Sequence, residues 1–238
     1  MDNMSGFLGE FFGTMILILL GVGCGAGVNL KDNYARGQNW MFITLAWGMA
    51  VTFGVYAAGQ MGSQGHLNPA VTLGFASAGL FSWNEVLPYL LGQGLGAFAG
   101  AALVILYYYP QFQATPNKDG NSVGIFATGP AIDRPFFNVL NECIATFFFI
   151  LILLNLGNFT TGLKPLIVGL LIMVVGQSLG GTTGFALNPA RDLMPRLAYS
   201  ILPVPHKANA NWGYAWVPIV GPLCGGILAS FVHVWING

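Results

Sequence analysis

The tripeptide Asn-Pro-Ala occurs twice in this chain, as Asn68-Pro69-Ala70 and as Asn188-Pro189-Ala190, 120 positions apart (188 − 68). Proline has no N–H group and suits the first turn of a helix, where that N–H would have no partner. Asparagine is a preferred N-cap, whose oxygen can cap the helix while its amide group donates elsewhere. The two copies therefore predict two helix starts, each with a side-chain donor pointing in front of it.

Two such helix starts would be chemically useful if they met head to head. Their side-chain donors and their partial positive charges would then point at one place. A cation, including a travelling proton, would meet an electrostatic barrier there, whereas a neutral molecule with oxygen acceptors would be oriented and passed along. The residues in front of each triplet would add backbone carbonyl acceptors: Gly65, His66, Leu67, Gly184 and Ala186. The pair thus predicts a path for small hydroxyl-bearing molecules.

The composition indicates a membrane protein. Of the 238 residues, 55% are hydrophobic and only 7% are charged, with a mean hydropathy of +0.66. Soluble domains carry about 25% charged residues. A soluble fold could not cover its surface with as few charges as this chain has. A formal net charge of zero without a basic cluster argues against nucleic acid as a partner. Three cysteines in apolar stretches, without metal-ligand spacing, predict neither a metal site nor a cofactor.

Eight apolar segments follow from the length that a membrane span requires, roughly 20 residues. Six are long enough to cross, and two shorter ones, 68–78 and 188–199, each start at a triplet. The N-terminus lacks the features of a cleaved signal peptide, so we expect the first segment to remain as a span. The six long segments are 6–28, 40–60, 85–108, 137–156, 164–181 and 213–236. The main polar connections are 29–39, 109–136 and 200–212.

The chain also repeats outside the triplets. Glu10 precedes Thr14 by four residues in the first span, and Glu142 precedes Thr146 by four in the fourth. We therefore expect one channel domain, 1–238, with repeat one at about 6–108, a connecting loop at 109–136 and repeat two at 137–236. Because three spans per repeat is an odd number, the second repeat must be inverted, and the short helices dip in from opposite faces. Glu10 and Glu142 are interpreted as braces for the loops before the triplets; a proton relay is the alternative.

These features resemble the aquaporin (major intrinsic protein) family, and within it the glycerol facilitators. The similarity runs from Gly9-Glu10-Phe11-Phe12-Gly13-Thr14 to Val217-Pro218-Ile219-Val220-Gly221-Pro222, with the paired triplets as its most specific part. The resemblance implies an all-α membrane protein with six transmembrane helices plus two re-entrant half-helices in two inverted repeats.

The same resemblance implies a four-residue selectivity filter on the extracellular side, formed by Trp47, Gly176, Phe185 and Arg191. Glycine in place of a bulky polar residue would widen the filter, two aromatic rings would face a carbon backbone, and the arginine would donate to hydroxyls. Four further positions resemble the glycerol branch: Asp192, Arg196, Pro218 and Ile219. Gln64 and the loop Gly181-Thr182-Thr183 depart from the family pattern.

The expected function is a passive channel for glycerol and other small uncharged solutes, with some water, that excludes ions and protons. The alternative keeps the pore but changes its main cargo to water, urea, dihydroxyacetone or undissociated lactic acid. An enzyme is not expected, because His66, His206 and His233 have no partners in the sequence that would build a catalytic site. A purely adhesive protein would leave the paired triplets and the filter arginine without a role.

The resemblance also implies a homotetramer in the cell membrane, with a pore in each protomer and with both termini cytoplasmic. The basic residues alone favour the opposite orientation, because cytoplasmic loops usually carry the excess of Lys and Arg. With the N-terminus inside, only Lys164 falls clearly inside, and the residues that fall outside are Lys31, Arg36, Lys118, Arg134 and Lys207.

Overall fold

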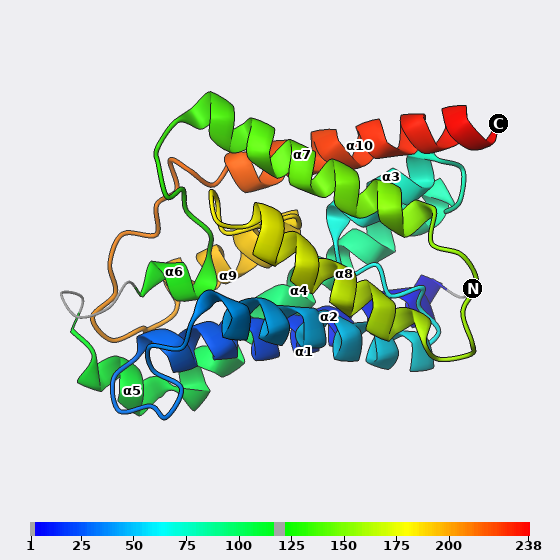
Figure 1. Cartoon of the computed structure of the whole chain (residues 1–238). Helices are drawn as coiled ribbons and strands as arrows, with labels where there is room; N and C mark the ends of the chain where they lie inside the picture. The colour runs from blue at the N-terminus through cyan, green and yellow to red at the C-terminus, as the bar shows by residue number, and fades with distance from the viewer. Residues whose placement is uncertain (1–2, 117–121) are drawn as a thin grey trace.

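The computed structural model describes residues 3–116 and 122–238, and within them it is helical without any strand (Figure 1). Long helices lie side by side as a bundle. Their order along the chain is α1 (Asn3–Asn29), α2 (Trp40–Gln60), α3 (Pro69–Ser77), α4 (Trp83–Tyr107), α5 (Tyr109–Ala114), α6 (Val123–Phe126), α7 (Pro135–Leu154), α8 (Lys164–Leu179), α9 (Pro189–Ile201) and α10 (Val217–Asn237).

Two halves repeat one arrangement: α1 to α4 form the first, and α7 to α10 the second. In each half, two long helices precede a short one and a third long helix follows it. Within the halves α1 packs along α4 and α7 along α10, while α2 and α8 join the halves. The helix α1 begins, and α10 ends, at one end of the bundle (Figure 1). This is the predicted fold class, which is confirmed by the similarity to a solved structure reported below.

Glycines let the paired helices approach closely, as small residues do between membrane helices. A Cβ atom at Gly92 of α4 would lie 2.6 Å from the Phe7 carbonyl oxygen of α1. In the second half, a Cβ atom at Gly221 of α10 would lie 2.6 Å from Cβ of Glu142 in α7. The close packing of α1 with α4 and of α7 with α10 places both glutamates inside the bundle, where neither is exposed.

Some boundaries differ from the sequence expectation. Five helices are long and apolar enough to span a membrane, and α8 is a shorter apolar helix of 16 residues, which corresponds to about 24 Å. The chain turns at 180–183 directly after α8. The expected connection 109–136 contains α5 and α6, and α10 starts at Val217 because 213–216 form turns. Lys118 lies outside the described residues.

The short helices α3 and α9 begin at the triplets, as the sequence predicts. Asn68 and Asn188 are their N-caps with extended backbone, and a proline occupies the first helical position of each. The residues just before them, 63–67 and 184–187, are not helical. Residues 61–77 are called the first re-entrant segment, and residues 180–201 the second.

Candidate functional site

The two triplets meet through a reciprocal pair of hydrogen bonds. Asn68 donates from Nδ2 to the carbonyl oxygen of Leu187 over 2.9 Å, and Asn188 donates from Nδ2 to the carbonyl oxygen of Leu67 over 2.7 Å. Each side chain also caps its own helix: Asn68 Oδ1 accepts from Ala70 N, and Asn188 Oδ1 accepts from the backbone at 190 and 191. An asparagine amide group carries two N–H donors. One therefore remains on each asparagine for a molecule between them.

The backbone in front of each triplet is bent in the same uncommon way. Leu67 has a φ of +51° and Leu187 a φ of +53°, in the left-handed region that bulky residues seldom occupy. Such a conformation costs of order 1–3 kcal/mol and persists only where its surroundings hold it. In both cases the residue supplies the carbonyl that the opposite asparagine binds, so the bend and the crossed hydrogen bonds belong together.

Glu10 holds the first re-entrant segment. Its carboxylate accepts from the backbone N–H groups of His66 and Leu67, at 2.8 and 2.6 Å, and from Oγ of Ser63. The side-chain amide of Gln93, on α4, donates 2.7 Å to the same carboxylate. A buried carboxylate satisfied by several donors is a strong anchor, and this arrangement is what the bracing interpretation of Glu10 expects.

Glu142 holds the second re-entrant segment in the same manner. Its carboxylate accepts from the backbone N–H groups of Ala186 and Leu187, both at 3.0 Å, and from Oγ1 of Thr183 at 2.6 Å. No side chain equivalent to Gln93 contacts it among the hydrogen bonds of the described residues. The two glutamates thus hold corresponding loops, on opposite sides of the crossed asparagines.

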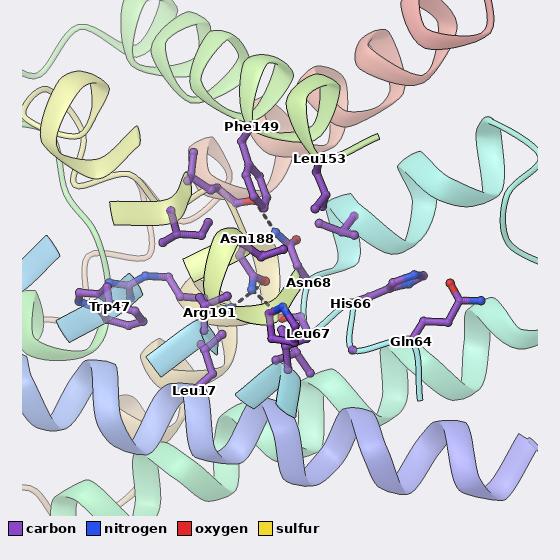
Figure 2. A pocket seen from close by; sticks show the side chains of 18 of the residues that line it. Leu17, Trp47, Gln64, His66, Leu67, Asn68, Phe149, Leu153, Asn188 and Arg191 are labelled. Atoms are coloured by element: carbon purple, nitrogen blue, oxygen red, sulfur yellow. Dashed lines mark hydrogen bonds between the residues drawn. The ribbon is translucent and has the colours of Figure 1, made fainter. Parts of the chain in front are cut away.

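A cavity of about 410 Å³ passes the two asparagines (Figure 2). Its lining includes Trp47 near one end and Gly59 at the other, both on α2. They are twelve positions apart (59 − 47), which is about 18 Å along the helix axis. The end at Trp47 and Arg191 is called the filter end below, and the opposite end is lined by Gly59, Gln64 and Lys164. Arg191 and Lys164 are the charged side chains that line it within the described chain.

Three of the four predicted filter residues surround the filter end: Trp47, Phe185 and Arg191. The guanidinium carbon of Arg191 lies 3.8 Å from the centroid of the Trp47 ring, a cation–π contact. Its Nη1 donates 3.2 Å to the Phe126 carbonyl oxygen. Guanidinium has five N–H donors, so others remain for a solute. The corner thus presents aromatic carbon beside charged donors.

Gly176, the fourth predicted filter residue, does not line the cavity but lies behind Phe185. A Cβ atom at this position would come 2.8 Å from Cε2 of the Phe185 ring. Trp40, which the sequence reasoning did not single out, supports the same place: its Nε1 donates to the Gly176 carbonyl oxygen over 3.0 Å, and its ring meets that of Phe185 edge to face. The glycine therefore makes room for the phenylalanine ring.

The predicted carbonyl residues Gly65, His66, Leu67 and Ala186 line the cavity, whereas Gly184 does not. Gly184, with a φ of +83°, packs instead against Thr128. The imidazole of His66 points away from the asparagines (Figure 2). It lies among the rings of Phe75, Phe81 and Tyr89, with Nδ1 3.2 Å from Thr72 Oγ1.

The four residues that resemble the glycerol branch lie in two different places. Asp192 and Arg196 form a fully buried ion pair on α9, with Arg196 Nη2 2.7 Å from Asp192 Oδ1. Arg196 also donates to the carbonyl oxygens of Ala210 and Asn211 and thereby fastens that loop to α9. A buried pair of this kind needs its remaining donors satisfied. Pro218 and Ile219 lie in the first turn of α10 and do not line the cavity.

Several contributors to this site carry no motif of their own. Gln93 in α4 and Ser63 in the first loop bind Glu10, and Thr183 in the second loop binds Glu142. A single polar residue in an apolar stretch nevertheless indicates no particular role. The one usable signal is that Ser63 and Thr183 each lie five residues before a triplet asparagine (68 − 63 and 188 − 183). Phe126 acts through its backbone carbonyl, which the side-chain pattern does not reveal.

Re-entrant half-helices meeting inside an inverted-repeat helical bundle, with a cavity through their junction, define a multi-pass membrane channel. The chain belongs to the major intrinsic protein family, which matches residues 1–233. It is 73% identical over 235 residues, 98% of this chain and all of the relative, to glycerol uptake facilitator protein 2 of Lactiplantibacillus plantarum. It is 48% identical to the glycerol uptake facilitator protein of Bacillus subtilis, covering 98% of this chain and 84% of that one.

Among solved structures, the chain is similar to the aquaglyceroporin from Plasmodium falciparum. The two share 31% of their residues, with a TM-score of 0.85 over 99% of this chain and 97% of the other. This similarity covers both repeats and both re-entrant segments.

Proposed function

We propose that this protein is a passive channel for glycerol and other small uncharged solutes, with some water, that excludes ions and protons. The observation that carries the proposal is the filter end of the cavity. There the rings of Trp47 and Phe185 stand beside the guanidinium of Arg191. A linear polyol has a carbon side and a hydroxyl side, so the apolar rings suit one and the donors suit the other. The names of the relatives support this choice of solute.

The junction of the asparagines supports the exclusion of protons and cations. Two helix N-termini meet there, each carrying about half a positive charge. A water molecule that accepts from both Asn68 and Asn188 would turn its own hydrogens outward, toward the two ends of the cavity. A continuous chain of water hydrogen bonds in one direction is then interrupted at this point. A cation would find donors rather than acceptors.

The charges along the cavity support passive transport. Its charged lining residues in the described chain, Arg191 and Lys164, are both cations, and acidic side chains are absent from that lining. Glu10 and Glu142 are occupied with loop N–H groups. Coupling to a cation gradient typically relies on acidic side chains that face the pathway of the ion. Net flow therefore follows the gradient of the solute.

We extend the proposal to the assembly and the orientation, which follow the family resemblance. The chain would form a homotetramer in the cell membrane, with a pore in each protomer and with both termini cytoplasmic. The common end of α1 and α10 agrees with termini on a single side (Figure 1). Undissociated lactic acid, which has an alcohol hydroxyl and a protonated carboxyl group on a short carbon chain, is a further solute that the same corner suits.

Stopped-flow light scattering on proteoliposomes tests the proposal, with water, glycerol, a larger polyol and lactic acid below its pKa as solutes. We expect fast glycerol entry that control liposomes without protein lack, and exclusion of the larger polyol. Fast water or lactic acid flux with slow glycerol flux would leave the channel and overturn the proposed main solute. Flux of none of these solutes would overturn the channel itself.

A further inference from the structure

The end of the connection between the two halves lies against the second re-entrant segment. The short helix α6 packs on α9 (Figure 1). Beyond it, Ala131 donates from its backbone N to the Thr182 carbonyl oxygen over 2.9 Å. The Phe126 carbonyl oxygen is the acceptor for Arg191. Residues 126–131, called the connector segment here, therefore contact the filter region from outside the repeated helices.

Thr128 is the residue of this connector segment with the most bonds to α9. Its backbone N and its Oγ1 both donate to Oδ2 of Asp192, at 2.6 and 2.7 Å. Its carbonyl oxygen accepts from Nη2 of Arg196 over 3.0 Å. All of its polar groups are thus bound to the ion pair that follows Arg191 in the chain. Since Asp192 and Arg196 are completely buried, this anchor is well defined.

The apolar side of Thr128 faces the backbone beside another filter residue. A Cβ atom added at Gly184 would lie 3.3 Å from both Cβ and Cγ2 of Thr128. Gly184 directly precedes Phe185. Thr128 consequently sits between the backbone that carries the Phe185 ring and the carboxylate next to Arg191, and it does not itself line the cavity.

We propose that Thr128 is a positioning residue that determines the specificity of the filter. Its hydroxyl ties the connector segment to Asp192, and this tie holds the Phe126 carbonyl where it orients the guanidinium of Arg191. The remaining donors of Arg191 then face the lumen beside the Trp47 ring. Small displacements of a positioned group have large effects on selection. The inference rests on the proposed function, because it concerns the preference for glycerol over water.

Two pairs of side chains that differ by a hydroxyl test this role at position 128. Threonine and Thr128→Val share a shape and differ in the donor to Asp192, and the same difference separates Thr128→Ser from Thr128→Ala. Thr115→Val is the matched control. Thr115 is also buried in the connection, and its Oγ1 binds the backbone of Gln111 and Lys31, away from the filter. The permeabilities to glycerol and to water are each measured per reconstituted channel, and their ratio is compared between variants.

We expect the ratio to fall about threefold or more in Thr128→Val, and to be lower in Thr128→Ala than in Thr128→Ser, while Thr115→Val keeps the wild-type ratio. A role in folding alone would lower both permeabilities together and leave the ratio unchanged, which would overturn the proposal. An equal fall in Thr115→Val would overturn it as well. If Thr128→Val does not fold, the comparison of Thr128→Ser with Thr128→Ala tests the role of the hydroxyl instead. Absence of glycerol flux in the wild type would instead remove the proposed function.

Discussion

The first and second re-entrant segments are built alike around the asparagines and differ away from them. Both have a capping asparagine, a leucine with positive φ, a hydroxyl residue and two backbone N–H groups bound to a buried glutamate. The first carries no charged residue between 61 and 78. The second carries Arg191, Asp192 and Arg196, and it has the connector segment packed against it.

This comparison separates two tasks within one fold. The shared features all converge on the crossed asparagines, where both halves contribute equally. The features found in the second segment alone converge on the filter end, away from the junction. Under the proposed function, exclusion at the junction therefore belongs to the repeat. The choice among neutral solutes, and a second positive barrier at Arg191, belong to what the second half has added.

The largest expected difference between the halves is in stability. Glu142→Ala leaves the N–H groups of Ala186 and Leu187 without an acceptor, at about 1–3 kcal/mol for each. Glu10→Ala removes the acceptor from the corresponding N–H groups of the first loop. Gln93 lies beside this loop, however, and Oε1 of Gln93 has no hydrogen-bond partner in the described structure. By turning its amide, Gln93 can supply a substitute acceptor. We expect a lower apparent Tm in detergent for Glu142→Ala than for Glu10→Ala.

The double variant Glu10→Ala with Gln93→Leu is the control, because it removes the substitute. It should unfold at a temperature as low as that of Glu142→Ala. If Glu10→Ala alone were the less stable of the two single variants, the two braces would differ in the opposite sense, and Gln93 would not be a substitute acceptor.

A second test concerns charge at the two ends of the cavity. Arg191→Val removes the donors at the filter end, and we expect the glycerol-to-water permeability ratio to fall about tenfold, the low end of the discrimination that one misfitting group in a binding site supplies. Leakage of charged or proton-carrying species should rise, as a pH-sensitive dye in the vesicles would show. Lys164→Gln removes the cation at the opposite end, away from the rings of Trp47 and Phe185, and should leave the ratio unchanged. Equal effects of both would refute the division of tasks.

A third test concerns the position behind the filter, where Gly176→Ala is expected to have the smallest effect of the variants named here. Gly176→His requires the Phe185 ring to move, since even a Cβ atom would lie 2.8 Å from it. Overpacking of this kind costs about 1–3 kcal/mol, and we expect glycerol flux to drop sharply while water flux is spared. Gly176→Ala should do the same to a smaller extent. Gly59→Ala is the matched control, because that glycine lines the cavity with open space around it. Undiminished glycerol flux in Gly176→His would show that Gly176 does not shape the filter.

Much of the fold could be predicted from the sequence, because the signals are local and repeated. The apolar lengths, the two Asn-Pro-Ala triplets and the Glu10 and Glu142 positions determine eight elements and their inversion. The end of α8 at Leu179 was missed by two residues, since the expected span 164–181 included Gly180 and Gly181, where the chain already turns.

The site was predictable where a side chain has a recognisable pattern and not where the backbone acts. The roles of Trp47, Phe185 and Arg191 stay predictions, now with a geometry to test. The crossed hydrogen bonds to the Leu67 and Leu187 carbonyls depend on positive φ values, which a leucine in the sequence does not predict. The contribution of Phe126 depends on a long connection whose path no periodicity specifies.

The most direct test of the division of tasks is a density map of the reconstituted protein at high glycerol concentration. It should show glycerol at the filter end, with its carbon atoms against Trp47 and Phe185 and at least one hydroxyl within hydrogen-bonding distance of Arg191. Water, or a second glycerol, should lie at Asn68 and Asn188. Glycerol bound at the Lys164 end, with the corner at Arg191 empty, would contradict the account.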